Sequence, residues 1–172
     1  MPQRWLRNRH DLQSLAYMAA QPVLMGWQWI HGLEPLLYAL SLFLAVGISV
    51  IHHNHAHLPM WHRRPANQAT DVVLTLLQGH PTCVLRPTHN ANHHRHRHGT
   101  RDVMRTWRFG DHNHLPGWVL HPLQAAWVMY PLVLRWLRRL ARQRPRAFAA
   151  CLSQYALWLG SWALLLWFDA GK

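Results

Sequence analysis

The stretch Leu36–Ile51, LLYALSLFLAVGISVI, runs without a break into HHNHAH at His52–His57. The run carries no charged residue and follows Pro35, a residue that favours the first turn of a helix. Sixteen helical residues cover about 24 Å, less than the ~30 Å hydrocarbon core of a bilayer. Leu33–Pro35 or the first histidines extend the helix to a spanning length. The sequence therefore predicts a membrane helix that brings histidines to the membrane surface.

Two further apolar runs indicate a helical membrane protein. Ala147–Phe168 carries no formal charge over 22 residues, and Leu12–Ile30 is mostly apolar but contains three glutamines and Pro22. Trp118–Leu134 contains two prolines and continues into an amphipathic segment rich in arginine, so we expect it to lie on the membrane surface. A buried helix of a soluble protein is the alternative for any single run. Together the runs predict an all-α integral membrane protein with about three spanning helices.

The positive charge is almost entirely arginine, and its distribution predicts the orientation. The chain has seventeen arginines, one lysine and a net charge of +12. Fourteen of the arginines lie between His52 and Arg146, and the other three lie near the N-terminus. The positive-inside bias then places a helical, His-rich section on the cytoplasmic side of a multi-pass protein. No RNA- or DNA-binding module combines these arginines with aromatic residues, so we expect no nucleic-acid partner.

Three local features complete the expected architecture. Cys83 and Cys151 belong to no C-x-x-C pair, which excludes a cysteine zinc site and predicts no disulfide framework. Thr70 and Asp71 form a cap for a short helix over Val72–Gln78, which ends at Gly79. His80 is isolated in the sequence, and we expect a structural or surface role for it.

Histidine is concentrated in two clusters whose spacing suits metal binding. The chain has 16 histidines, and the second cluster reads HNANHHRHRH from His89 to His98. At about 100° per helical residue, His53 and His57 share a face, as do His89 and His93. Neutral imidazole binds iron, zinc, copper and nickel. A polar cytoplasmic surface is the alternative, but two matching pairs favour a metal site.

The remaining histidines of the clusters have less favourable geometry. His94 is turned by about 100° from His93, which suits a ligand of a second metal ion. His55 points to nearly the opposite side of its helix from His53. His96 falls near the face of His89 and His93, so helical geometry alone does not exclude it.

His53-x-x-x-His57 and His89-x-x-x-His93-His94 resemble the first two of the three histidine boxes of membrane fatty acid desaturases and related hydroxylases. The resemblance covers most of the chain and implies one desaturase-like membrane domain over residues 1–172. It also implies a centre of two iron ions bound by His53, His57, His89, His93 and His94. Such a centre activates O2 to introduce a double bond into a fatty acyl chain.

The sequence departs from this pattern because no third histidine box follows the last apolar run. The chain is therefore expected to be either a C-terminally truncated front part of such an enzyme, inactive as this fragment, or an unusual variant of the family, and we favour truncation. His112 and His114, in DHNH, are candidates for the missing ligands, and His55 and His96 are further secondary candidates. A polar loop beside Gly110 and Pro116 is the blander interpretation of DHNH.

The resemblance also defines the expected partners, which are a membrane lipid or acyl substrate and O2. The chain has no G-x-G-x-x-G motif for a nucleotide cofactor and no cysteine cluster for an iron–sulfur centre. We therefore expect electrons to come from a separate donor such as a ferredoxin or cytochrome. A lipid or carotenoid hydroxylase of the same superfamily, and a non-enzymatic membrane metal-binding protein, are the alternative functions.

Overall fold

The computed structural model describes residues 5–105 and 114–168. Every regular element within these ranges is a helix, as predicted. The chain divides into two compact units at the junctions Thr82–Cys83 and Leu152–Ser153. The elements in chain order are α1 (Asp11–His31), α2 (Pro35–His57), α3 (Arg64–Gln78), the 3-10 turn η1 (Thr82–Val84), the π-helix η2 (Arg86–His93), α4 (His94–His96), α5 (Leu115–Gln143) and α6 (Pro145–Phe168).

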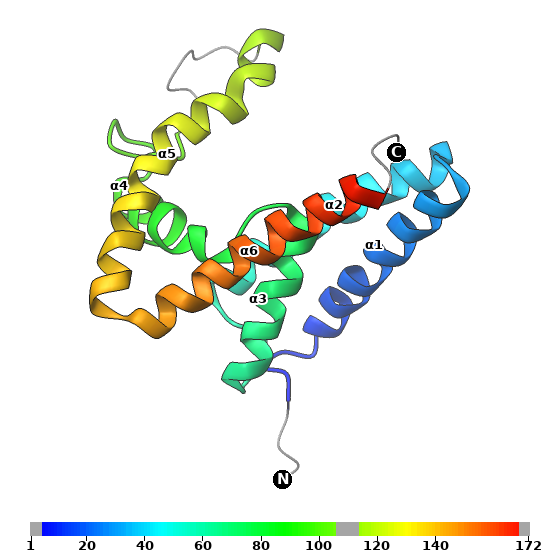
Figure 1. The fold of residues 1–172 in the computed structure, drawn as a ribbon, viewed down its shortest axis with the longest axis horizontal. Coiled ribbons are helices and arrows are strands. Elements are labelled where there is room, and N and C mark those ends of the chain that lie inside the picture. Colours follow the sequence, from blue (N-terminus) through cyan, green and yellow to red (C-terminus); the bar gives the residue numbers. More distant parts are fainter. Residues whose placement is uncertain (1–4, 106–113, 169–172) are drawn as a thin grey trace. The chain divides into compact units, whose positions relative to one another are not determined.

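Helices α1 and α2 form an antiparallel hairpin in the first unit (Figure 1). Gly32 ends α1 with a φ of 91°, and the Glu34 carboxylate caps α2 by accepting hydrogen bonds from the N–H groups of Leu36 and Leu37 at 3.0 and 3.1 Å. Further along α2, a Cβ atom added at Gly47 would lie 2.8 Å from the Tyr17 ring of α1. Glycine at this position therefore allows the two helices to approach closely, as small residues do in membrane helix pairs.

Helix α3 packs on the hairpin around a small buried core, which consists of Met18, Ile48, Met60 and Leu74. It begins at Arg64 rather than at Val72, because Pro65 suits the first turn of a helix. Thr70 does not cap the helix, since its hydroxyl donates to the carbonyl of Ala66 and accepts from the Trp61 indole N–H. The predicted end at Gly79 is correct, with a left-handed φ of 67°.

The second unit contains the other histidine cluster and a disulfide. Cys83, in η1, is bonded to Cys151, in the first part of α6, and both residues are buried. The prediction that these cysteines form no disulfide is wrong. Local spacing does not reveal the pairing, because 68 positions separate the two residues and the fold alone brings them together.

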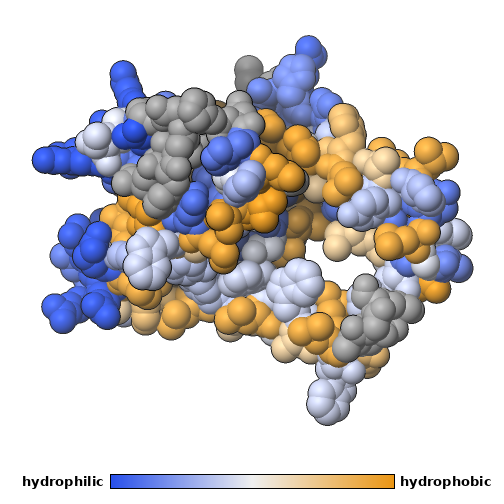
Figure 2. All heavy atoms as spheres, turned by 90° about the horizontal axis from the view of Figure 1, so that it is seen from above, coloured by the Kyte–Doolittle hydropathy of each residue, from blue (hydrophilic) through white to orange (hydrophobic). Residues whose placement is uncertain are grey.

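Helices α2 and α6 are the two described helices that are long and apolar enough to cross a membrane. Only 22% of the apolar window of α2 and 11% of that of α6 is buried, which is the opposite of what the core helix of a soluble protein requires. Hydrophobic side chains accordingly reach the molecular surface in Figure 2. Helix α1 is long enough but is not one of these two candidate spans, because its glutamines reduce its hydropathy.

Helix α5 is continuous over the segment for which we predicted a surface location, despite Pro122 and Pro131. Its exposed side chains are of two kinds. Apolar ones include Leu123 and Trp127, and charged ones include Arg135 and Arg138. This composition agrees with an amphipathic helix at a membrane interface.

Candidate metal centre

The π-helix η2 brings the predicted ligands of the second cluster together. His89 and His93 have stacked rings with centroids 5.1 Å apart, and the His94 ring lies 4.8 Å from that of His89. The Nε2 atoms of His89 and His94 are 3.2 Å apart. A π-helix pairs residues five positions apart, so it returns His94 to the face of His89. Three imidazoles therefore converge within one turn.

This arrangement changes the expected role of His94. Two nitrogens that bind one ion at about 2.1 Å and about 90° apart lie about 3 Å from each other. The 3.2 Å separation between His89 and His94 is compatible with a shared ion. The α-helical geometry assumed from the sequence instead directed His94 toward a second ion. The wider π-turn accounts for the difference.

A fully buried carboxylate holds the third imidazole of this cluster. Asp102 has no exposed surface, and its Oδ2 atom lies 2.7 Å from Nδ1 of His93. The same oxygen accepts the backbone N–H of His98 at 2.7 Å, and Oδ1 accepts that of Met104 at 2.8 Å. Burial opposes ionisation of Asp102, but these N–H donors and the His93 ring hold the pKa of Asp102 below its usual value. The carboxylate is therefore charged and acts as the acceptor of the His93 Nδ1–H.

This contact fixes the tautomer of His93. A proton on Nδ1 leaves Nε2 as the nitrogen with a free lone pair, which is the form that a metal binds. A carboxylate behind a histidine ligand is the usual second-layer arrangement of protein metal sites. The sequence analysis missed Asp102, because nothing in its spacing relates it to His93. Left-handed backbone at Arg97 and His98 turns the chain back and brings Asp102 to the ring.

The first cluster is carried on the last turns of α2. His53 and His57 are both exposed, and their ring centroids lie 4.8 Å apart, so they share a helix face as predicted. No proline or other break separates them from the apolar part of the helix. The apolar run thus fixes the position of this pair at the end of a membrane helix.

His55 has a different role from its neighbours, because both of its nitrogens already have protein partners. The ring is buried, its Nδ1 accepts the Met60 N–H at 3.2 Å, and its Nε2 lies 3.5 Å from the Asp71 carboxylate of α3. Since Nδ1 accepts, Nε2 carries the proton and donates toward Asp71. His55 therefore connects α2 to α3 and has no lone pair available for a metal.

The buried His52 packs against the half-buried His80, a contact that the sequence did not indicate. Their ring centroids are 5.0 Å apart, His52 is only 2% exposed, and its Nε2 atom has no hydrogen-bond partner within the described ranges. Burial lowers the pKa of His80, so this ring is neutral at pH 7. His80 thus packs against His52, the first residue of the first cluster, and has the structural one of the two roles that we expected.

The secondary candidates fall in other places. His114 is the N-cap of α5, where its Nδ1 accepts the Gly117 N–H at 2.9 Å. His112 lies outside the described residues. His96 is half-buried. Of the histidines that follow His94, it is His98 whose ring contacts that of His93, with centroids 4.8 Å apart. The structure therefore draws attention to His98, which the sequence analysis did not consider as a ligand.

The donor set of the second cluster fits a transition metal ion. Nitrogen atoms of His93 and His98 and a carboxylate oxygen of Asp102 lie within 4.8 Å of one another. Both cysteines are in the disulfide, so this group offers imidazole nitrogens and a carboxylate oxygen rather than thiolates. Such a set suits iron, zinc, copper or nickel rather than a thiolate-selecting metal site.

Comparison with known proteins identifies the family to which these features belong. The profile of the fatty acid desaturase family matches residues 27–171. The chain belongs to the fatty acid desaturase family. The matched residues include α2, both histidine clusters and α6, so the match covers the two membrane candidates together with the candidate ligands. No curated protein and no solved structure matches the chain significantly. Membership of the desaturase family indicates an oxidoreductase that is associated with membranes.

The contrast between His55 and His53 gives a testable prediction. His55→Ala removes the acceptor of the Met60 N–H and the donor to Asp71, and such losses at buried groups cost about 1–3 kcal/mol. We expect a lower thermal unfolding temperature for the metal-free, detergent-purified protein. His53→Ala is the matched control, because His53 is exposed on the same helix. Equal unfolding temperatures for the two variants would contradict the structural role of His55.

A second prediction concerns Asp102. Asp102→Asn keeps the size of the side chain but removes the negative charge that holds the His93 proton on Nδ1. Loss of such a carboxylate lowers metal affinity by about 10–100-fold. We expect this weakening in a titration of the metal-free protein with Co2+, followed by its visible absorption.

Asp71→Asn is the control for Asp102→Asn, because Asp71 also faces a histidine, but one without a free lone pair. It should leave Co2+ affinity unchanged. Unchanged affinity in a folded Asp102→Asn variant would show that the carboxylate does not position a ligand.

Proposed function

We propose that this desaturase-family protein is an O2-dependent, di-iron oxidoreductase that introduces a double bond into a fatty acyl chain. The observation that carries the proposal is the convergence of three imidazoles on η2, one of them held by a buried carboxylate. A solvated histidine-rich surface has no need of a fully buried Asp102 with three donors. The family match supports iron over zinc, copper and nickel, which the same ligands would accept.

His53 and His57 from α2, with His89, His93 and His94 from η2 and α4, are the residues that we propose to hold the metal. When bound, iron would supply the redox chemistry by which O2 is reduced and a C–H bond of the acyl chain is broken. The protein's part is to present neutral imidazoles and to exclude competing reactions. Asp102 does the first by keeping the His93 proton on Nδ1. The single His93–Asp102 contact therefore prepares the ligand before metal arrives.

The reaction requires an external source of electrons. Removal of two hydrogens from –CH2–CH2– supplies two electrons and two protons, whereas reduction of O2 to two water molecules consumes four of each. A donor must therefore provide the remaining two electrons, and solvent the remaining two protons. Both cysteines of the chain are held in the buried disulfide and form no metal-binding cysteine cluster that could relay electrons. We propose a ferredoxin or cytochrome as the donor.

The apolar helices and the distribution of arginines support a proposed membrane arrangement. We propose that the protein crosses the bilayer more than once, with both histidine clusters on the cytoplasmic side. The support is the exposure of α2 and α6 and the excess of arginine in the segments that flank the clusters. Exposed arginines on α5 suit contact with anionic headgroups at the same membrane surface. An acyl substrate would then reach the imidazoles from the adjacent leaflet.

Product analysis tests the proposed reaction. The iron-loaded protein would be supplied with reduced ferredoxin, O2 and membrane vesicles of saturated phospholipid, and the acyl chains analysed by mass spectrometry. With a protein extended beyond Lys172 to include a third histidine box, we expect chains that have lost two hydrogens, and none with the His93→Ala variant of that protein. Chains that gain one oxygen atom would show a hydroxylase. Unaltered chains from a protein that binds iron would overturn the proposed reaction.

A further inference from the structure

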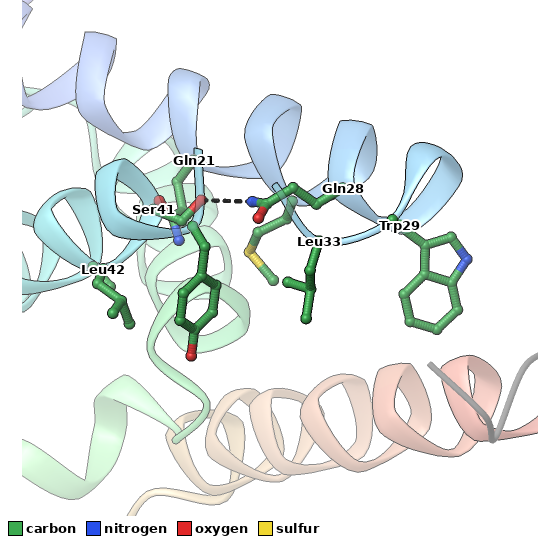
Figure 3. A pocket seen from close by; sticks show the side chains of 10 residues that line it. Gln21, Gln28, Trp29, Leu33, Ser41 and Leu42 are labelled. Carbon is green, nitrogen blue, oxygen red and sulfur yellow. Dashed lines mark hydrogen bonds between the residues drawn. The ribbon is translucent and has the colours of Figure 1, made fainter. Parts of the chain in front are cut away.

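A cavity between α1 and α2 is separate from the histidine clusters. Its volume is about 490 Å³, within the range of small-molecule pockets, and its apolar lining includes Met25, Trp29, Leu33 and Leu42. Figure 3 shows the side chains of Trp29, Leu33 and Leu42 projecting to the same side of the hairpin. Ser41 lines the cavity and precedes His53 by twelve residues, which is about 18 Å along a helix. A molecule in this cavity therefore lies away from the proposed site of oxygen chemistry.

Three polar side chains form one wall of the cavity, and two of them are incompletely paired. Gln28 donates its amide N–H to Ser41 Oγ at 3.0 Å, which is the dashed contact in Figure 3, and to the Leu24 carbonyl at 3.3 Å. Its Oε1 atom is buried and has no hydrogen-bond partner within the described part of the chain. The Oε1 atom of Gln21 is in the same condition. Gln21 is 5% exposed and Gln28 is 9% exposed.

These two oxygens are costly where they are. An unpaired amide in apolar surroundings costs about 2–7 kcal/mol. Rotating the Gln28 amide does not solve the problem, because its oxygen would then face the carbonyl oxygen of Leu24. Two residues that line the cavity therefore carry carbonyl oxygens that need hydrogen-bond donors, and these residues lie seven positions apart on one face of α1.

We infer that this cavity binds an uncharged membrane amphiphile that carries a hydroxyl group on a long aliphatic chain. The ligand must donate, because both unpaired atoms are acceptors, and this disfavours a fatty acid anion or a phosphate group. It must be uncharged, because none of the described residues that line the cavity is a lysine, arginine, aspartate or glutamate. Its chain would contact Trp29, Leu33 and Leu42 while the hydroxyl group bonds to Gln21 and Gln28. This site is distinct from the proposed acyl substrate site.

Binding of a matched pair of probes tests this inference. The full chain in detergent would be titrated with 1-hexadecanol and with its methyl ether, which has the same chain but no hydroxyl proton, and complexes counted by native mass spectrometry. Since one hydrogen bond changes affinity several-fold, we expect the alcohol to bind about tenfold more tightly. Gln21→Leu and the double variant with Gln28→Leu should reduce this preference to about one.

Gln13→Leu is the control, because Gln13 is exposed on the same helix and outside the cavity. It should keep the preference for the alcohol. Equal binding of alcohol and ether by the wild-type chain, or no binding of either by folded protein, would overturn the inference. The metal content of the Gln21→Leu variant should equal that of the wild type, so failure here and failure of the proposed oxidoreductase function are distinguishable.

Discussion

The need to pair every backbone polar group inside a bilayer is the constraint on which the rest of this structure depends. Helix α2 meets it with unbroken helical hydrogen bonds from Pro35 to His57. Because the helix does not end at the edge of its apolar run, it carries His53 and His57 on the same rigid rod. Two imidazoles are thereby held at a fixed place near the membrane surface without any loop to position them. Buried polar side chains also need hydrogen-bond partners, and the Oε1 atoms of Gln21 and Gln28 on α1 have none within the described residues.

Neighbouring histidines in each cluster have different physical roles. On α2, His55 faces Met60 and Asp71 and stabilises the packing of α3, whereas His53 and His57 remain exposed. On η2, a carboxylate engages His93 through one nitrogen and leaves the other available. In both clusters, the partner of each nitrogen decides whether a histidine supports the fold or can bind a metal. Counting histidines does not separate these roles.

The sequence predicted the features that depend on local periodicity. The apolar run before His52 and the i, i+4 pair of His53 and His57 follow from composition and α-helical spacing, and both are present. The π-helix was not predictable, because α-helical angles were assumed where the chain pairs residues five apart. The disulfide and the His93–Asp102 contact depend on chain reversals that bring distant residues together. No local pattern encodes those reversals.

The metal content of the purified chain tests the central claim most directly. The protein would be expressed with iron supplied, purified in mild detergent and measured by elemental analysis beside the His93→Ala variant. We predict iron in stoichiometric amount in the wild-type chain and its loss from the variant, since both clusters are proposed to bind iron. Zinc or nickel in place of iron, or equal iron in both proteins, would contradict the assignment of these histidines to an oxygen-activating iron centre.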